Sequence, residues 1–121
     1  MELISTLSGR CDYVDNGLAA IELVRESLLR CRNTSQISGY FTLILLDYSM
    51  PQINGPTTAQ KILELYAEEH AISDYVPPLP HIVCLTAFTE KIFENKARDS
   101  GMNEFVSKPI TNSKLKQILR E

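Results

Sequence analysis

Three polar residues, Asp47, Thr86 and Lys108, stand at the ends of apolar runs of the kind that form buried strands. A carboxylate can act as a nucleophile that accepts an acyl or phosphoryl group. A lysine ammonium is a movable point charge suited to phosphate oxygens, and a threonine hydroxyl can donate one further hydrogen bond to the same group. Together the three residue types indicate a site that holds an aspartyl phosphate, provided that the fold brings them together.

Each of these residues also has an ordinary structural interpretation. Asp47 could cap a turn or a helix, Thr86 could cap a helix, and Lys108 could be a solvated surface lysine. Their joint placement, each at the end of a separate strand, favours a shared site over three unrelated roles.

Strands and helices are expected to alternate along the chain. Continuous apolar runs such as "FTLILLD" are typical of strands that are buried on both faces. Gly101 is placed to end one helix and Thr111 to cap the next. The expected strands cover residues 11–14, 41–47, 81–87 and 103–108. The expected helices cover 17–31, 89–100 and 111–121, with a further helix that begins at 55 and fades within 68–74.

This alternation predicts an α/β fold, in which parallel strands carry helices on both faces of the sheet. Ligands of such sheets gather at the carboxyl ends of the strands. The expected fold therefore brings the aspartate, the threonine and the lysine to one edge, and Asp47 is placed to meet a ligand there.

Composition indicates one domain and excludes several function classes. The chain has 121 residues, 44% of them hydrophobic, which suits a single core. A net charge of −3 argues against non-specific binding of nucleic acid, and no apolar run approaches the roughly 20 residues of a membrane span. Three cysteines, Cys11, Cys31 and Cys84, lie in apolar contexts, which predicts buried thiols in a reducing, cytoplasmic setting.

Four segments resemble the response-regulator receiver domains of two-component (His-Asp phosphorelay) signalling. They are "DNGLAAIELV", "LILLDYSMPQINGP", "IVCLTA" and "SGMNEFVSKPI", and they follow one another in the family's order over residues 10–121. The resemblance implies a flavodoxin-like, doubly wound parallel sheet with the strand order 2-1-3-4-5.

The resemblance also implies a role for each site residue. Asp47 would accept a phosphoryl group from a phosphohistidine on a histidine kinase or a histidine phosphotransfer protein. Lys108 would pair with the phosphate, Thr86 would move to bond it, and Phe105 would rotate inward when the threonine moves. The backbone carbonyl of Ser49 would help Asp47 bind Mg²⁺.

Four further positions match structural residues of the family's loops around this site. They are Met50, Pro51 and Gly55 after the acceptor, and Pro109, which follows the lysine through a peptide bond that is usually cis in the family.

One departure from the family concerns the start of the chain. Receivers begin with a strand that ends in two adjacent acidic residues, which hold the Mg²⁺, and no such pair precedes Asp47 here. We therefore expect the first strand to be absent, residues 1–9 to be the remnant of the first helix, and residues 10–121 to run from the second strand to the last helix. The Mg²⁺ site would then be incomplete, since this ion usually takes one or two carboxylates besides the phosphate.

Two explanations of that departure stay open, and each carries a function. The chain is either part of a longer phosphoacceptor receiver, such as one joined in cis to a hybrid sensor kinase, or a degenerate receiver-like module that acts through its surfaces alone. The first would work in the cytoplasm or as the cytoplasmic part of a membrane-bound kinase. A remote third hypothesis is an aspartate-nucleophile phosphatase of the haloacid-dehalogenase type. That family has a second aspartate two residues after the first, where this chain has Ser49.

Overall fold

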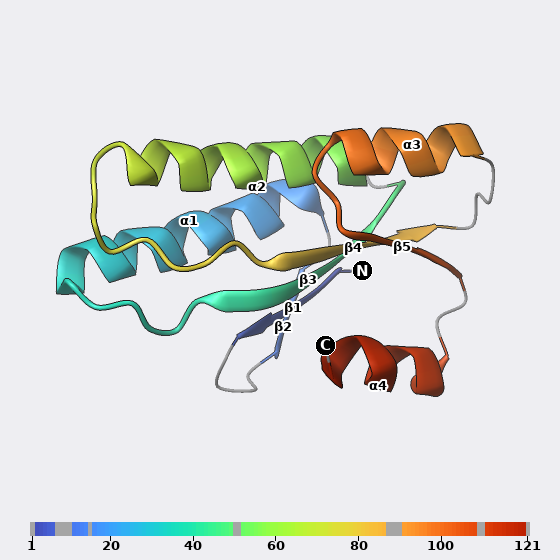
Figure 1. Ribbon diagram of the computed structural model, residues 1–121, viewed down its shortest axis with the longest axis horizontal. Coiled ribbons are helices and arrows are strands. Elements are labelled where there is room, and N and C mark those ends of the chain that lie inside the picture. Colours follow the sequence, from blue (N-terminus) through green and yellow to red (C-terminus); the bar gives the residue numbers. More distant parts are fainter. Residues whose placement is uncertain are drawn as a thin grey trace.

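The computed structural model describes residues 2–6, 11–14, 16–49, 52–86, 91–108 and 111–120. From β2 onward, strands and helices alternate as the sequence predicts (Figure 1). The elements are β1 (Glu2–Thr6), β2 (Cys11–Val14), α1 (Gly17–Thr34), β3 (Phe41–Asp47), α2 (Gly55–His70), β4 (His81–Thr86), α3 (Lys91–Asp99), β5 (Glu104–Ser107) and α4 (Asn112–Arg120).

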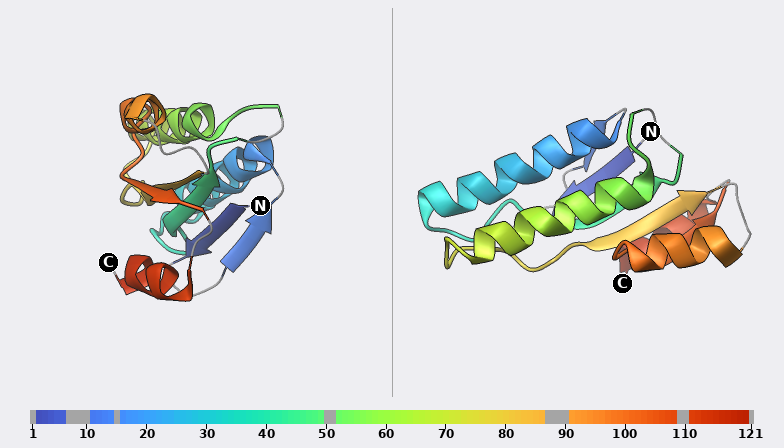
Figure 2. Two further views of the ribbon diagram at one scale, coloured as in Figure 1. Left: turned by 90° about the vertical axis from the view of Figure 1, so that its right-hand side faces the viewer. Right: turned by 90° about the horizontal axis from the view of Figure 1, so that it is seen from above.

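The strands form one sheet in the order β2-β1-β3-β4-β5. The pairs β3–β4 and β4–β5 are parallel, as expected, and β1 is antiparallel to both of its neighbours. Helices α1, α2 and α3 cover one face, and α4 lies on the opposite face (Figures 1 and 2). The predicted α/β fold with a doubly wound sheet is confirmed.

The interpretation of residues 1–9 as the end of a helix is wrong for the part that the structure describes. Glu2–Thr6 is a strand, in which Leu3 pairs with Tyr13 on one side and with Leu45 on the other. The place between β2 and β3, expected to be empty, is therefore occupied by a strand of reversed direction. The physical reason is that β2 and β3 would otherwise leave rows of backbone N–H and C=O groups unpaired, and this segment provides their partners.

Both faces of the central strands are buried. On the side of α1 and α2, Ile44 and Leu46 of β3 and Ile82 of β4 are fully covered and pack with Val24 and Ile62 of the helices. On the other side a second cluster is formed by alternate residues of three strands, namely Leu43, Leu45, Val83, Leu85 and Val106. Burial on two faces explains why the runs of β3 and β4 are continuously apolar.

The helix boundaries follow local signals in the sequence. At the start of α2, the Thr57 N–H donates to the side-chain oxygen of Asn54 at 2.9 Å. At the start of α4, the Lys114 N–H donates to the Thr111 hydroxyl at 3.1 Å, which confirms the predicted cap. Gly101 follows α3 with a φ of 92°, a left-handed conformation that favours glycine, as expected at that end. None of the described helices combines the length and apolarity that crossing a lipid bilayer requires.

Candidate functional site

The parallel register brings the three polar residues to one edge of the sheet. Asp47 is the last residue of β3 and lies opposite Leu85 of β4. Thr86 ends β4 opposite Ser107 of β5, so the next residue, Lys108, leaves the sheet at the same edge. The sequence therefore placed these residues correctly with respect to one another.

Asp47 and Lys108 are in direct contact. The Lys108 Nζ lies 3.0 Å from the Asp47 Oδ1, and the side chains are 44% and 14% exposed, respectively. The Lys108 backbone N–H also donates to the Thr86 carbonyl at 2.8 Å, which holds the Lys108 backbone beside β4. A pair open to solvent contributes little to stability. The Asp47–Lys108 pair matters more for chemistry than for stability. The positive charge of Lys108 would stabilise any further negative charge added to Asp47.

Thr86 and Phe105 lie on neighbouring strands beside this pair. Thr86 is 2% exposed, so its hydroxyl is held inside the sheet edge. Phe105 is opposite Cys84 in the β4–β5 pairing and is partly buried against the core on the side of α1 and α2. An aromatic ring at a partly buried position next to a buried threonine is suited to a change of packing between the two.

Tyr48, the residue that follows Asp47, is held between β4 and the start of α2. The Gly55 N–H donates to the Tyr48 carbonyl at 2.8 Å, and the Tyr48 N–H donates to the Leu85 carbonyl at 2.8 Å. A Cβ atom added at Gly55 would collide with the backbone carbonyl oxygen of Asp47. The close approach of two backbones explains why glycine stands at this position.

Sequence reasoning missed a contact next to Asp47. The Tyr48 ring meets the Phe93 ring of α3 edge to face, with centroids 5.4 Å apart and planes at 88°. Tyr48 is 7% exposed and belongs to the main core. The sequence signal was weak. An aromatic residue directly after a strand and another in a short helix do not predict how that helix is rotated about its own axis, and this rotation decides whether the two rings meet.

The remaining expected site residues are only partly described. Ser49 is exposed two residues after Asp47. The expectations for Met50, Pro51 and Pro109 lie outside the described residues.

The residues present fit a Mg²⁺ ion only in part. Asp47 offers one carboxylate, and no group of three or more His, Cys, Asp or Glu side chains suited to a metal occurs in the described part of the chain. Mg²⁺ demands near-octahedral oxygen coordination, and one carboxylate with carbonyl and phosphate oxygens provides few charged ligands for it.

The charge of Asp47 also affects the pKa of a buried thiol in the core, that of Cys84. Burial, followed by the negative charge of Asp47, raises the pKa of the Cys84 thiol to about 12, and Lys108 opposes this shift. Cys84 and Cys31 are both buried free thiols, as the sequence predicts. The Cys84 thiol is therefore neutral near pH 7 and unsuited to act as a nucleophile.

Comparison with known proteins gives one family. A model of the response regulator receiver domain matches residues 3–120. The osmosensing histidine protein kinase SLN1 of Saccharomyces cerevisiae is 31% identical over 121 residues, which is all of this chain and 8% of the kinase. The chain therefore spans a small part of that relative's length.

Two solved structures are also similar. The receiver domain of the histidine kinase CKI1 from Arabidopsis thaliana, complexed with Mg²⁺, superposes with a TM-score of 0.72 at 19% identity, covering 88% of this chain and 68% of that chain. The co-crystal structure of the Saccharomyces cerevisiae histidine phosphotransfer protein Ypd1 with the receiver domain of its response regulator Ssk1 gives a TM-score of 0.65. The identity is 25%, and the match covers 85% of this chain and 63% of that chain.

Proposed function

Because the chain belongs to the response-regulator receiver domain family, we propose that Asp47 accepts a phosphoryl group in a phosphorelay. The observation that carries the proposal is the contact between Asp47 and Lys108 at 3.0 Å, at the carboxyl edge of the parallel strands. An ionised carboxylate is the required nucleophile, and the adjacent ammonium offsets the charge that the incoming phosphoryl group adds.

The donor would be a phosphohistidine on a histidine kinase or on a histidine phosphotransfer protein. The similarity to SLN1 and to the Ssk1 receiver, which was crystallised with a phosphotransfer protein, supports this class of partner. The kinase could be part of the same polypeptide. In either case we propose that the reaction takes place in the cytoplasm.

Mg²⁺ would assist by neutralising the phosphoryl oxygens, with the Asp47 carboxylate and the Ser49 carbonyl as its protein ligands. Since the described residues offer no acidic pair, we expect the ion to bind weakly and transfer to need a high concentration of it. The chain's own contribution is the position of the Asp47 oxygens and the charge of Lys108.

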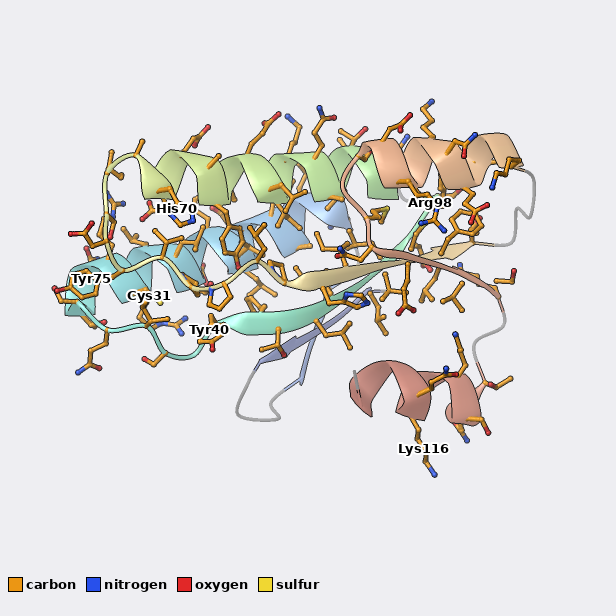
Figure 3. The ribbon with its side chains drawn as sticks, viewed as in Figure 1. Cys31, Tyr40, His70, Tyr75, Arg98 and Lys116 are labelled. Carbon is orange, nitrogen blue, oxygen red and sulfur yellow. The ribbon has the colours of Figure 1, made fainter. Side chains whose placement is uncertain are left out.

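The signal would leave the site through α3, β5 and α4. The Thr86 hydroxyl would move toward a phosphoryl group on Asp47, and Phe105, on the neighbouring strand, would fill the space that it leaves; the burial of Thr86 next to β5 supports this. Tyr48 adds a second connection, because it directly follows the acceptor and touches Phe93 of α3. The response would be a population shift between two packings of this face. Lys114 and Lys116 add positive charge to its α4 edge, and Lys116 projects away from the sheet (Figure 3).

The proposal is tested by phosphorylation with a small phosphodonor at several Mg²⁺ concentrations, with the product read by intact-protein mass spectrometry. We expect one added phosphoryl group on the wild-type chain and none on Asp47→Asn. A matched control is Asp74→Asn, which removes an exposed carboxylate from the loop after α2 and should leave the reaction unchanged.

Two outcomes would overturn the assignment. Phosphorylation that persists in Asp47→Asn would place the acceptor elsewhere. No incorporation at any Mg²⁺ concentration would favour the second candidate, a receiver-like interaction module. The observation behind that candidate is the thin set of acidic metal ligands among the described residues.

A further inference from the structure

A groove runs along the outer surface between α1 and α2, on the face of the sheet away from α4. It contains a hollow of about 220 Å³, and a second hollow adjoins it and shares the lining residues Arg25, Leu65 and Glu68. The groove lies along the helices and not at the sheet edge that carries Asp47.

The two sides of the groove carry opposite charge. The α1 side presents Arg25 and Arg32. The α2 side presents Glu64, Glu68 and Glu69, with one cation among them, Lys61, in the second hollow, so this side is acidic on balance. Arg32 and Glu69 meet across the groove at 3.5 Å, yet the Arg32 Nε and the Glu69 Oε2 are buried without a hydrogen-bond partner among the described residues. Arg25 pairs with Glu22 of its own helix, and because both side chains are more than half exposed this pair is weak.

Exposed apolar side chains gather at the same end of the molecule. Leu29 and Ile72 line the groove and are 42% and 61% exposed. Ile37, Tyr75 and Leu79 are also exposed and lie in the two loops that leave α1 and α2. Figure 3 shows Tyr75 at this end of the molecule. Apolar side chains that gather with a polar rim are typical of protein interaction sites.

We propose that this groove binds a second copy of the chain. Helices α1 and α2 lie side by side and run in the same direction (Figure 2). A two-fold axis along the groove would therefore place α1 of each copy over α2 of the other at the same level. The basic α1 side of each copy then faces the acidic α2 side of the other, so the favourable contact is made two times. The partner also covers Leu29 and Ile72. The surface is self-complementary, as a symmetric dimer interface requires.

The charge pattern gives a specific test by sedimentation velocity over a wide range of protein concentration. We expect the wild-type chain to form dimers reversibly. Arg25→Glu and Glu68→Arg should each weaken the dimer about tenfold or more, because like charges then face each other across the axis. The double variant Arg25→Glu/Glu68→Arg restores opposite charges and should recover dimerisation.

A matched control is Arg30→Glu, which makes the same charge change at an exposed position of α1 that does not line the groove. It should dimerise like the wild type, and circular dichroism of each variant would verify that the fold is retained. A wild-type chain that stays monomeric at all concentrations overturns the proposal. The proposal is also overturned if the double variant dimerises no more tightly than the single variants. The same holds if the Arg30→Glu control dimerises as weakly as the single variants do.

Discussion

The contact between Tyr48 and Phe93 is predicted to couple the residue that follows Asp47 to α3. With ring centroids 5.4 Å apart and planes at 88°, the pair has the favoured edge-to-face arrangement. Such a pair contributes about 0.5–1.5 kcal/mol beyond the burial of its rings. Since Tyr48 is 7% exposed, little water competes with the contact, and we expect about 1 kcal/mol for the coupling between the two side chains.

A double-mutant cycle measures this coupling directly. The free energy of unfolding in urea is determined for the wild type, Tyr48→Leu, Phe93→Leu and the double variant. The double variant should lose about 1 kcal/mol less than the sum of the single losses, because each single change already removes the contact. The same variants should reduce the shift of α3 amide resonances when a phosphate mimic binds at Asp47.

A control cycle combines Tyr48→Leu with Phe41→Leu. Phe41 is equally buried in β3 but lies at the opposite end of that strand, so its loss should add to that of Tyr48. Additive losses in the Tyr48–Phe93 cycle, within about 0.3 kcal/mol, would refute the reasoning. A coupling as large in the control cycle would also refute it, because it would reflect a general loss of core packing.

Two further predictions concern the core. Tyr66→Phe should raise the free energy of unfolding in urea by about 1 kcal/mol, because the Tyr66 hydroxyl is buried with no partner among the described residues. If the free energy of unfolding instead falls by about that amount, the hydroxyl is hydrogen-bonded in the folded protein. The raised pKa of Cys84, about 12 against an ordinary 9.0, means that the unfolded chain releases the thiol proton first. The free energy of unfolding should therefore fall as pH rises above 9, by up to about 1.4 kcal/mol per pH unit. The fall should be shallower in Cys84→Ala. If the free energy of unfolding falls equally steeply with pH in both proteins, Cys84 is not the group responsible.

The parallel part of the sheet and the meeting of Asp47, Thr86 and Lys108 could be predicted from the sequence. Continuous apolar runs identify β3 and β4, and in a parallel sheet each residue that follows a strand must emerge at the same edge. That rule needs no knowledge of side-chain packing. It was therefore sufficient to predict that Lys108 approaches Asp47.

The start of the chain could not be predicted in the same way. Glu2–Thr6 is short and has no clear alternation, and its strand conformation depends on the hydrogen bonds that β2 and β3 offer on both sides. Its antiparallel direction is a tertiary property that no local pattern in these five residues indicates. The contact of Tyr48 with Phe93 and the groove between α1 and α2 were missed for a similar reason, since both depend on how each helix is rotated about its own axis.

The close approach of Gly55 to Asp47 has a mechanical consequence. Because the Asp47 carbonyl leaves no space for a Cβ at the first turn of α2, β3 and α2 are joined as one stiff body, to which α1 is packed. If Asp47 is phosphorylated as proposed, we expect the resulting displacement to be directed away from this body and toward α3, which Tyr48 contacts through Phe93. A dimer held through the α1–α2 groove would be equally stable with and without a phosphoryl group. It would act as a fixed frame that keeps two output faces at a constant distance while each face responds to its own acceptor.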